Sequence, residues 1–287
     1  MTEVRRTPDA RFDGLPDWPY EPRYTDVDGL RLARVDEGAG PPVVLLHGEP
    51  TWGFLYRNVI PRLVGAGRRV VVPDAPGFGR SDKPVGVEWY SYESHSRALA
   101  GHLAALDLRD VTLVVQDWGG PLGLRWAMEN AARVARLVVL NTGLFSGRDA
   151  PPGLKAWLDY ARTLTDLDVG AVVSAACGGL APEVVRGYDA PFPDASYKAG
   201  ALAFPRLVPT SAGDAGAREQ AAVRAALDEW DGPVSVAFSD GDPIFPAAVG
   251  EAWARRLRRA TFTTIEGAGH FVQEMRPEAV VDVVLEF

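Results

Sequence analysis

The stretch Leu113-Val114-Val115-Gln116-Asp117-Trp118-Gly119-Gly120 decides the fold of this chain. In it a β-branched run ends abruptly at an acidic residue, and two glycines follow. This order predicts a buried strand, a sharp turn and the start of a helix, which is the layout of a nucleophile elbow. Such a turn raises one side chain above the edge of a sheet. A solvated aspartate at the end of a strand would give a similar sequence. Other segments of the chain must therefore decide between a nucleophile and an ordinary turn residue.

The side chain at this turn is the carboxylate of Asp117 rather than a hydroxyl. A carboxylate is a poor nucleophile for acyl transfer but a good one at saturated carbon, where its attack leaves an ester. The sequence therefore predicts displacement at an sp³ carbon that carries a leaving group. Val115 departs from the usual elbow pattern, in which a small residue occupies that position.

The composition excludes several classes of protein. The chain has 287 residues, of which 47% are hydrophobic, and this suffices for one or two domains with a sizeable core. A net charge of −8 without a basic cluster predicts no nucleic-acid partner. Cys177 is the single cysteine, so no internal disulfide or thiolate metal site can form. No apolar run approaches the roughly 18 residues of a membrane helix. We expect a cytoplasmic, globular protein that acts as a monomer, with no membrane partner.

Short β-branched runs alternate with helical stretches along the chain. The predicted strands are Val43–His47, Val70–Pro73, Val111–Gln116, Leu137–Asn141, Val234–Phe238 and Thr261–Ile265, and a hairpin over Thr25–Val27 and Arg31–Asp36 adds two more. The predicted helices are Phe54–Val64, His95–Leu106, Pro121–Asn130 and Ala247–Leu257. This alternation indicates an α/β fold, with a mostly parallel eight-stranded sheet and helices on both faces.

Residues 145–228 break this rhythm, because the segment is rich in alanine and proline and contains no good strand. We interpret it as a helical cap inserted into a core of residues 1–144 and 229–287. Open α/β sheets bind their ligands at the carboxyl ends of the strands, so a cap there would close a pocket and exclude water.

Two further segments supply partners for Asp117. His47-Gly48-Glu49-Pro50 follows a predicted strand where α/β-hydrolases place an oxyanion hole, and its donors would be the backbone N–H groups of Glu49 and Trp118. An ordinary strand-to-helix turn is the plainer reading of this segment. Gly267-Ala268-Gly269-His270-Phe271 presents an imidazole late in the chain, and histidine is the side chain best suited to act as a base near neutral pH.

The third catalytic partner is an acid that orients His270. Ser239-Asp240-Gly241-Asp242-Pro243 ends a predicted strand and offers two candidates. We expect Asp242 to be the acid, because this group usually lies a few residues beyond the strand, and Asp240 to be a turn residue. The order nucleophile, acid, base is that of the α/β-hydrolase fold.

Together these motifs resemble the haloalkane dehalogenases. The likeness rests on His47 to Trp52, Val114 to Gly120 and Gly267 to Glu274, and it extends into the cap through Ala190-Pro191-Phe192-Pro193-Asp194. It covers the chain from about Tyr20 to its end. The cap segment resembles the subfamily whose catalytic acid follows the later strand.

The resemblance implies a small haloalkane as substrate, an ester on Asp117, and alcohol, halide and a proton as products. No metal or organic cofactor is implied. Two indole N–H groups would bind the halide ion, from Trp118 and from the cap residue Trp157, although Trp157 could also serve only cap packing. Another branch of the family has an asparagine in place of Glu49. The implied pocket lining consists of Pro121, Leu154, Phe192, Pro193, Ile244 and Phe245.

Two alternatives stay open at this point. An epoxide hydrolase uses the same elbow, base and ester, but needs cap tyrosine hydroxyls, for which Tyr160, Tyr188 and Tyr197 are available. Gln116 stands where such enzymes often have a histidine. The second alternative is a ligand-binding protein without catalysis on the same scaffold, which the presence of nucleophile, acid and base disfavours.

Overall fold

An eight-stranded sheet runs through the centre of the computed structural model, which describes residues 3–147 and 150–286. Its spatial order is β10-β9-β8-β7-β4-β5-β3-β2. The strands from β10 to β5 in this order run parallel, whereas β3 pairs antiparallel with both β5 and β2. The bounds are β2 Arg23–Val27, β3 Leu30–Glu37, β4 Pro42–Leu46, β5 Arg69–Pro73, β7 Val111–Gln116, β8 Val134–Leu140, β9 Val234–Ser239 and β10 Ala260–Ile265.

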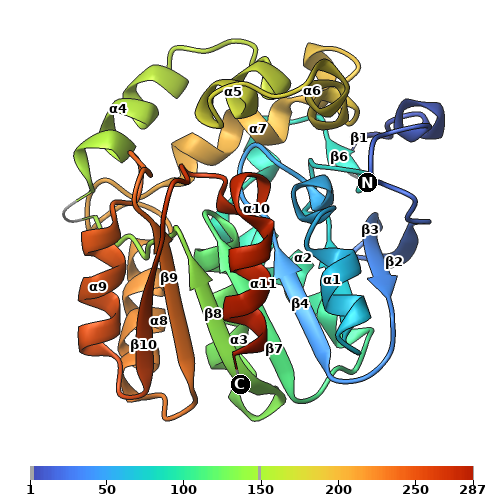
Figure 1. The fold of residues 1–287 in the computed structure, drawn as a ribbon. Coiled ribbons are helices and arrows are strands. Elements are labelled where there is room, and N and C mark those ends of the chain that lie inside the picture. Colours follow the sequence, from blue (N-terminus) through green and yellow to red (C-terminus); the bar gives the residue numbers. More distant parts are fainter. Residues whose placement is uncertain (1–2, 148–149, 287) are drawn as a thin grey trace.

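Helices cover both faces of the sheet (Figure 1). In this view α1 (Ile60–Gly65) and α11 (Pro277–Leu285) lie in front, and α2 (Tyr92–Ala104) and α3 (Gly119–Glu129) lie behind. Because both faces are covered, all six residues of β7 are buried, which explains its continuous apolar sequence. The predicted α/β architecture with eight strands is confirmed. No helix in the described part of the chain is both long and apolar enough to span a bilayer.

The segment predicted as one helix over Phe54–Val64 is divided in two. A 3-10 helix, η2, occupies Gly53–Tyr56, and α1 begins only at Ile60. Pro61 lies in the first turn of α1, where its fixed φ and missing N–H favour a helix start over a helix interior. The sequence analysis also missed a small antiparallel sheet of β1 (Val4–Arg5) and β6 (Lys83–Pro84).

A cap of short helices lies over the carboxyl ends of the parallel strands (Figure 1). It consists of α4 (Pro152–Ala161), α5 (Val169–Ala176), α6 (Pro182–Asp189) and α7 (Ala199–Ala203). The helix α8 (Ala217–Glu229) falls within the predicted cap segment 145–228, yet it packs against α3 beside the sheet. We therefore propose that the cap ends before α8 and that the core resumes there. The helix α9 (Ala247–Arg256) packs on β9 and β10, and the short helix α10 (Val272–Met275) packs against α11.

Candidate active site

The turn after β7 is as sharp as its sequence predicts. Asp117 follows the strand directly and has a φ of +47°, in the left-handed region that non-glycine residues rarely adopt. The two residues after Trp118 must be small, because a Cβ on Gly119 would lie 2.6 Å from the carbonyl oxygen of Leu46. A Cβ on Gly120 would lie 1.9 Å from Oγ1 of Thr142. This hydroxyl donates to the carbonyl oxygen of Asp117 at 2.6 Å and secures the strained turn.

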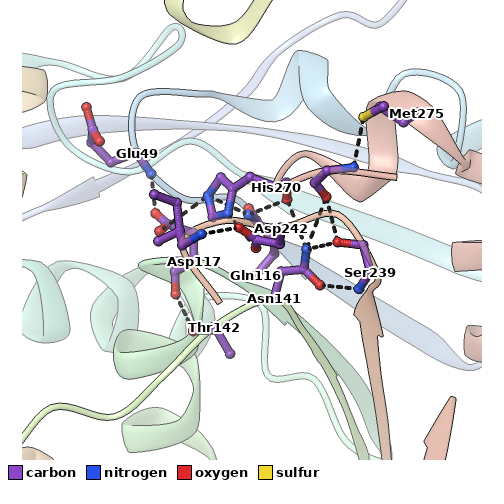
Figure 2. Close-up of polar contacts among 11 residues, drawn as sticks. Glu49, Gln116, Asp117, Asn141, Thr142, Ser239, Asp242, His270 and Met275 are labelled. Atoms are coloured by element: carbon purple, nitrogen blue, oxygen red, sulfur yellow. Dashed lines mark hydrogen bonds and ion pairs between the residues drawn. The ribbon is translucent and has the colours of Figure 1, made fainter. Parts of the chain in front are cut away.

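The loop after β4 approaches Asp117 from the neighbouring strand. The backbone N–H of Glu49 donates to Asp117 Oδ1 at 2.8 Å, as the predicted oxyanion hole requires (Figure 2). A Cβ on Gly48 would lie 2.3 Å from the Asp117 side chain, so only glycine permits this approach. Trp118, the second predicted donor, follows Asp117 as the N-cap residue of α3.

His270 lies between two carboxylates (Figure 2). Its Nδ1 is 2.9 Å from Asp242 Oδ2, and its Nε2 is 3.6 Å from Asp117 Oδ2. Asp242 is buried, and its other oxygen accepts the backbone N–H of Ile244 at 2.7 Å. Asp240 is exposed and instead accepts the N–H of Gly267 at 2.9 Å. The geometry thus pairs His270 with Asp242 rather than with Asp240.

The charges around His270 favour its protonated form. Burial lowers the pKa of this imidazole, but the negative charges and hydrogen bonds of Asp242 and Asp117 outweigh it and raise the pKa to about 10. With these two acids beside it, His270 is therefore cationic near neutral pH. A group that neutralised Asp117 would remove one of the two negative charges that raise the pKa of His270.

Glu49 behaves differently from these two acids. Its side chain is buried, and no ion pair joins it to a cation in the described part of the chain. Burial raises the pKa of Glu49 well above its usual range, and the nearby charge of Asp117 raises it further. Burial therefore disfavours the charged form of this carboxyl group.

Two side-chain amides also contact His270, and the sequence analysis assigned no role to either. Nε2 of Gln116 lies 3.2 Å from Nε2 of the imidazole and 3.3 Å from the carbonyl oxygen of His270. Nδ2 of Asn141 lies 3.4 Å from the same carbonyl oxygen. The available signal was a polar residue at the end of a buried apolar strand, since Gln116 ends β7 and Asn141 follows β8.

A cavity of about 530 Å³ opens above Asp117 between the core and the cap. Nine predicted site residues line it: Glu49, Asp117, Trp118, Pro121, Leu154, Trp157, Ile244, Phe245 and His270. The indole of Trp157 comes from α4 and that of Trp118 from the elbow. In the described part of the chain, neither indole N–H is hydrogen-bonded to protein. Both N–H groups are thus available to a ligand.

The prediction that Phe192 and Pro193 line the pocket is wrong. Phe192 is buried in the core, 6.4 Å from the ring of Phe78, and Pro193 is exposed. This part of the cap contacts the N-terminal segment, where Oγ1 of Thr7 donates to the carbonyl oxygen of Pro191 at 2.6 Å. The lining that the sequence analysis missed includes Ala171, Val172, Ala175 and Ala176 of α5, with Pro205 and Val208.

One end of the cap is attached to the core by a buried polar cluster. Arg57 and Glu274 form a bidentate ion pair with two contacts of 2.6 Å, and both side chains are almost fully buried. The hydroxyl of Tyr188, from α6, donates to the same carboxylate. Beside it, the indole of Trp52 donates to the carbonyl oxygen of Gly187 at 3.0 Å. The described residues include no cluster of three or more His, Cys, Asp or Glu that could hold a metal ion.

Comparison with known proteins agrees with this geometry. Residues 41–277 match a family model described as the alpha/beta hydrolase fold. A haloalkane dehalogenase of Psychrobacter cryohalolentis is 41% identical over 99% of this chain and 98% of its own length. Haloalkane dehalogenase 1 of Mycobacterium tuberculosis is 45% identical, over 95% and 94%. The tetrameric haloalkane dehalogenase of Paraglaciecola agarilytica superposes with a TM-score of 0.93 at 36% identity, over 99% and 97%.

Proposed function

This chain belongs to the haloalkane dehalogenase family of α/β hydrolases, and on that premise we propose that Asp117, His270 and Asp242 are its nucleophile, base and orienting acid. The enzyme is a hydrolase that acts on carbon–halogen bonds. A small haloalkane is converted to an alcohol, a halide ion and a proton. The observation that carries the role assignment is the contact of His270 with both carboxylates beneath a mainly apolar cavity.

In the first step an oxygen of Asp117 attacks the carbon that carries the halogen. The new C–O bond forms as the C–halogen bond breaks, and the halide leaves with the bonding electron pair. The indole N–H groups of Trp118 and Trp157 stabilise the charge that develops on the halide. Such donors are effective in a site from which water is excluded. The product is an alkyl ester of Asp117, which carries no charge.

In the second step His270 removes a proton from a water molecule, which attacks the ester carbonyl carbon of Asp117. The backbone N–H groups of Glu49 and Trp118 hold the oxyanion, and Asp242 stabilises the imidazolium. Cleavage of the bond between this carbon and the alkyl oxygen restores the carboxylate. The second proton of the water ends on the alcohol, and the first is released from His270.

An epoxide hydrolase is less well supported by the position of the cap tyrosines. Of the three candidates only Tyr160 lines the cavity. Tyr188 is engaged with Glu274 outside it. Ring opening by a pair of tyrosine hydroxyls would therefore need a large rearrangement of the cap.

The decisive experiment replaces His270, the proposed base, and measures how much halide the variant releases. We expect His270→Phe to release about one equivalent of halide from 1,2-dibromoethane and then to stop, because alkylation precedes the step that needs the base. Intact-protein mass spectrometry should show the added alkyl mass, and peptide mass spectrometry should locate it on Asp117. Asp117→Ala is the matched control and should release none. Continuous turnover by folded His270→Phe would refute the two-step scheme.

We further propose that the enzyme needs no cofactor and acts as a monomer. The second point is supported by the surface, since the only exposed large hydrophobic residues among those described are Tyr24, Val87 and Tyr160, which are far apart in sequence. A cytoplasmic location stays a prediction.

A further inference from the structure

Gln116 is a fully buried glutamine directly before the proposed nucleophile. Its amide nitrogen lies 3.2 Å from Nε2 of His270 and 3.3 Å from the carbonyl oxygen of the same residue. Its amide oxygen has no hydrogen-bond partner among the described residues. The side chain therefore directs both of its N–H groups at the residue that acts as the base (Figure 2).

The orientation of this amide is fixed by its surroundings. If the amide were flipped, its oxygen would face the carbonyl oxygen of His270, and two acceptors would be in contact. Asn141 cannot remove this contact between two acceptors, because its Nδ2 only donates to the same carbonyl oxygen. The nitrogen of Gln116 consequently faces His270, with one hydrogen for the carbonyl oxygen and one for the imidazole ring.

A donor at this position discriminates between the two protonation states of the imidazole. Nδ1 is committed to Asp242 as a donor, at 2.9 Å. Nε2 can accept an N–H only if it carries a lone pair, so the contact with Gln116 stabilises neutral imidazole and opposes imidazolium. This neutral tautomer is the one that can take a proton from water at Nε2.

We propose that Gln116 is a positioning residue that stabilises the neutral tautomer of His270 in the ester intermediate, by donating to Nε2 until the hydrolytic water replaces it. The proposal rests on the role of His270 as the base of the second step. The hydrogen bond from Gln116 stabilises the neutral imidazole, whereas the two carboxylates around it stabilise the imidazolium. At 3.2 Å the contact is long enough to give way when a water molecule approaches Nε2.

The other groups that face His270 define when this effect matters. Asp117 and Asp242 favour the cation, and Glu49 is a buried acid whose pKa is raised well above its usual range. Before alkylation both carboxylates are charged, and the single donor of Gln116 is outweighed. After alkylation Asp117 is an uncharged ester, and only Asp242 opposes Gln116. The influence of Gln116 should therefore be visible in the second step and not in the first.

Gln116→Met tests this, because it keeps the volume of the side chain and removes the donor. We expect the pH midpoint of ester hydrolysis in single turnover to rise by about half to one pH unit, which corresponds to one ordinary hydrogen bond. Gln116→Glu should raise the midpoint further, since a carboxylate stabilises the imidazolium. The rapid release of the first halide should stay within about threefold of the parent enzyme in both variants.

Gln273→Met is the matched control. Gln273 is also fully buried near this loop, but its amide contacts Tyr56 and not the imidazole, so the midpoint should not move. An unchanged midpoint in folded Gln116→Met would refute the proposal. If Gln116→Met does not fold, Gln116→Glu decides the same question. Failure of His270→Phe to accumulate the ester would instead refute the base itself, so the two failures are distinguishable.

Discussion

Replacing Trp157 with phenylalanine tests how the cap takes part in the chemistry. The substitution keeps an aromatic ring on α4 and deletes one N–H that has no protein partner in the described part of the chain. The cavity lining around it is mainly apolar. Removing one donor from a desolvated anion site costs roughly 2–4 kcal/mol of transition-state stabilisation. This corresponds to a fall of about 30- to 900-fold in the rate of carbon–halogen cleavage.

The measurement is the pre-steady-state burst of halide with matched chloro-, bromo- and iodoalkanes. The loss should be largest for the chloroalkane, because chloride is the poorest leaving group of the three and needs the most stabilisation. Quenching of tryptophan fluorescence by added halide should weaken in parallel. Trp253→Phe is the control, since this buried tryptophan lies on α9 and does not line the cavity. Near-normal cleavage of the chloroalkane with undiminished quenching would assign Trp157 to cap packing alone.

Two further predictions concern stability. Tyr188→Phe removes the hydroxyl that donates to Glu274 and should lower the free energy of unfolding by about 1–3 kcal/mol in urea titrations; an unchanged midpoint would contradict its anchoring role. His95→Leu should reduce the acid sensitivity of the fold. Burial lowers the pKa of His95 to about 3, so between pH 3 and about 6.5 the unfolded chain binds a proton that the native chain does not. For this residue the free energy of unfolding therefore decreases by about 1.4 kcal/mol for each unit by which the pH is lowered in this range. If the variant and the parent enzyme lose stability equally steeply between pH 6 and pH 4.5, the prediction is wrong.

Much of the fold and the centre of the site could be predicted because they depend on local rules. Parallel strands covered on both faces are continuous apolar runs, so β4, β7 and β9 are visible in the sequence. The ends of parallel strands share one edge of the sheet. A polar residue just beyond such an end is therefore placed near the others, which is how Asp117, Asp242 and His270 could be brought together before their distances were known.

The errors lie where a segment is positioned by a distant part of the chain. Phe192 and Pro193 follow a motif typical of the cap, but their position depends on the N-terminal segment, where Thr7 binds Pro191. The sequence analysis gave that segment no structural role. The helix α8 likewise follows the cap in sequence, yet its partner is α3, some ninety residues earlier. No periodicity within either segment carries this information.

The environment of His270 links the two steps of the reaction through charge. A base flanked by two carboxylates is held in its protonated form, in which it cannot activate water. Alkylation of Asp117 removes one negative charge and leaves Asp242 as the remaining one. Glu49 lies beside the nucleophile, and burial raises the pKa of its carboxyl group well above its usual range. Gln116 then opposes a single carboxylate instead of two. The ester thereby lowers the pKa of the base that is to hydrolyse it, and the order of the two steps follows from electrostatics.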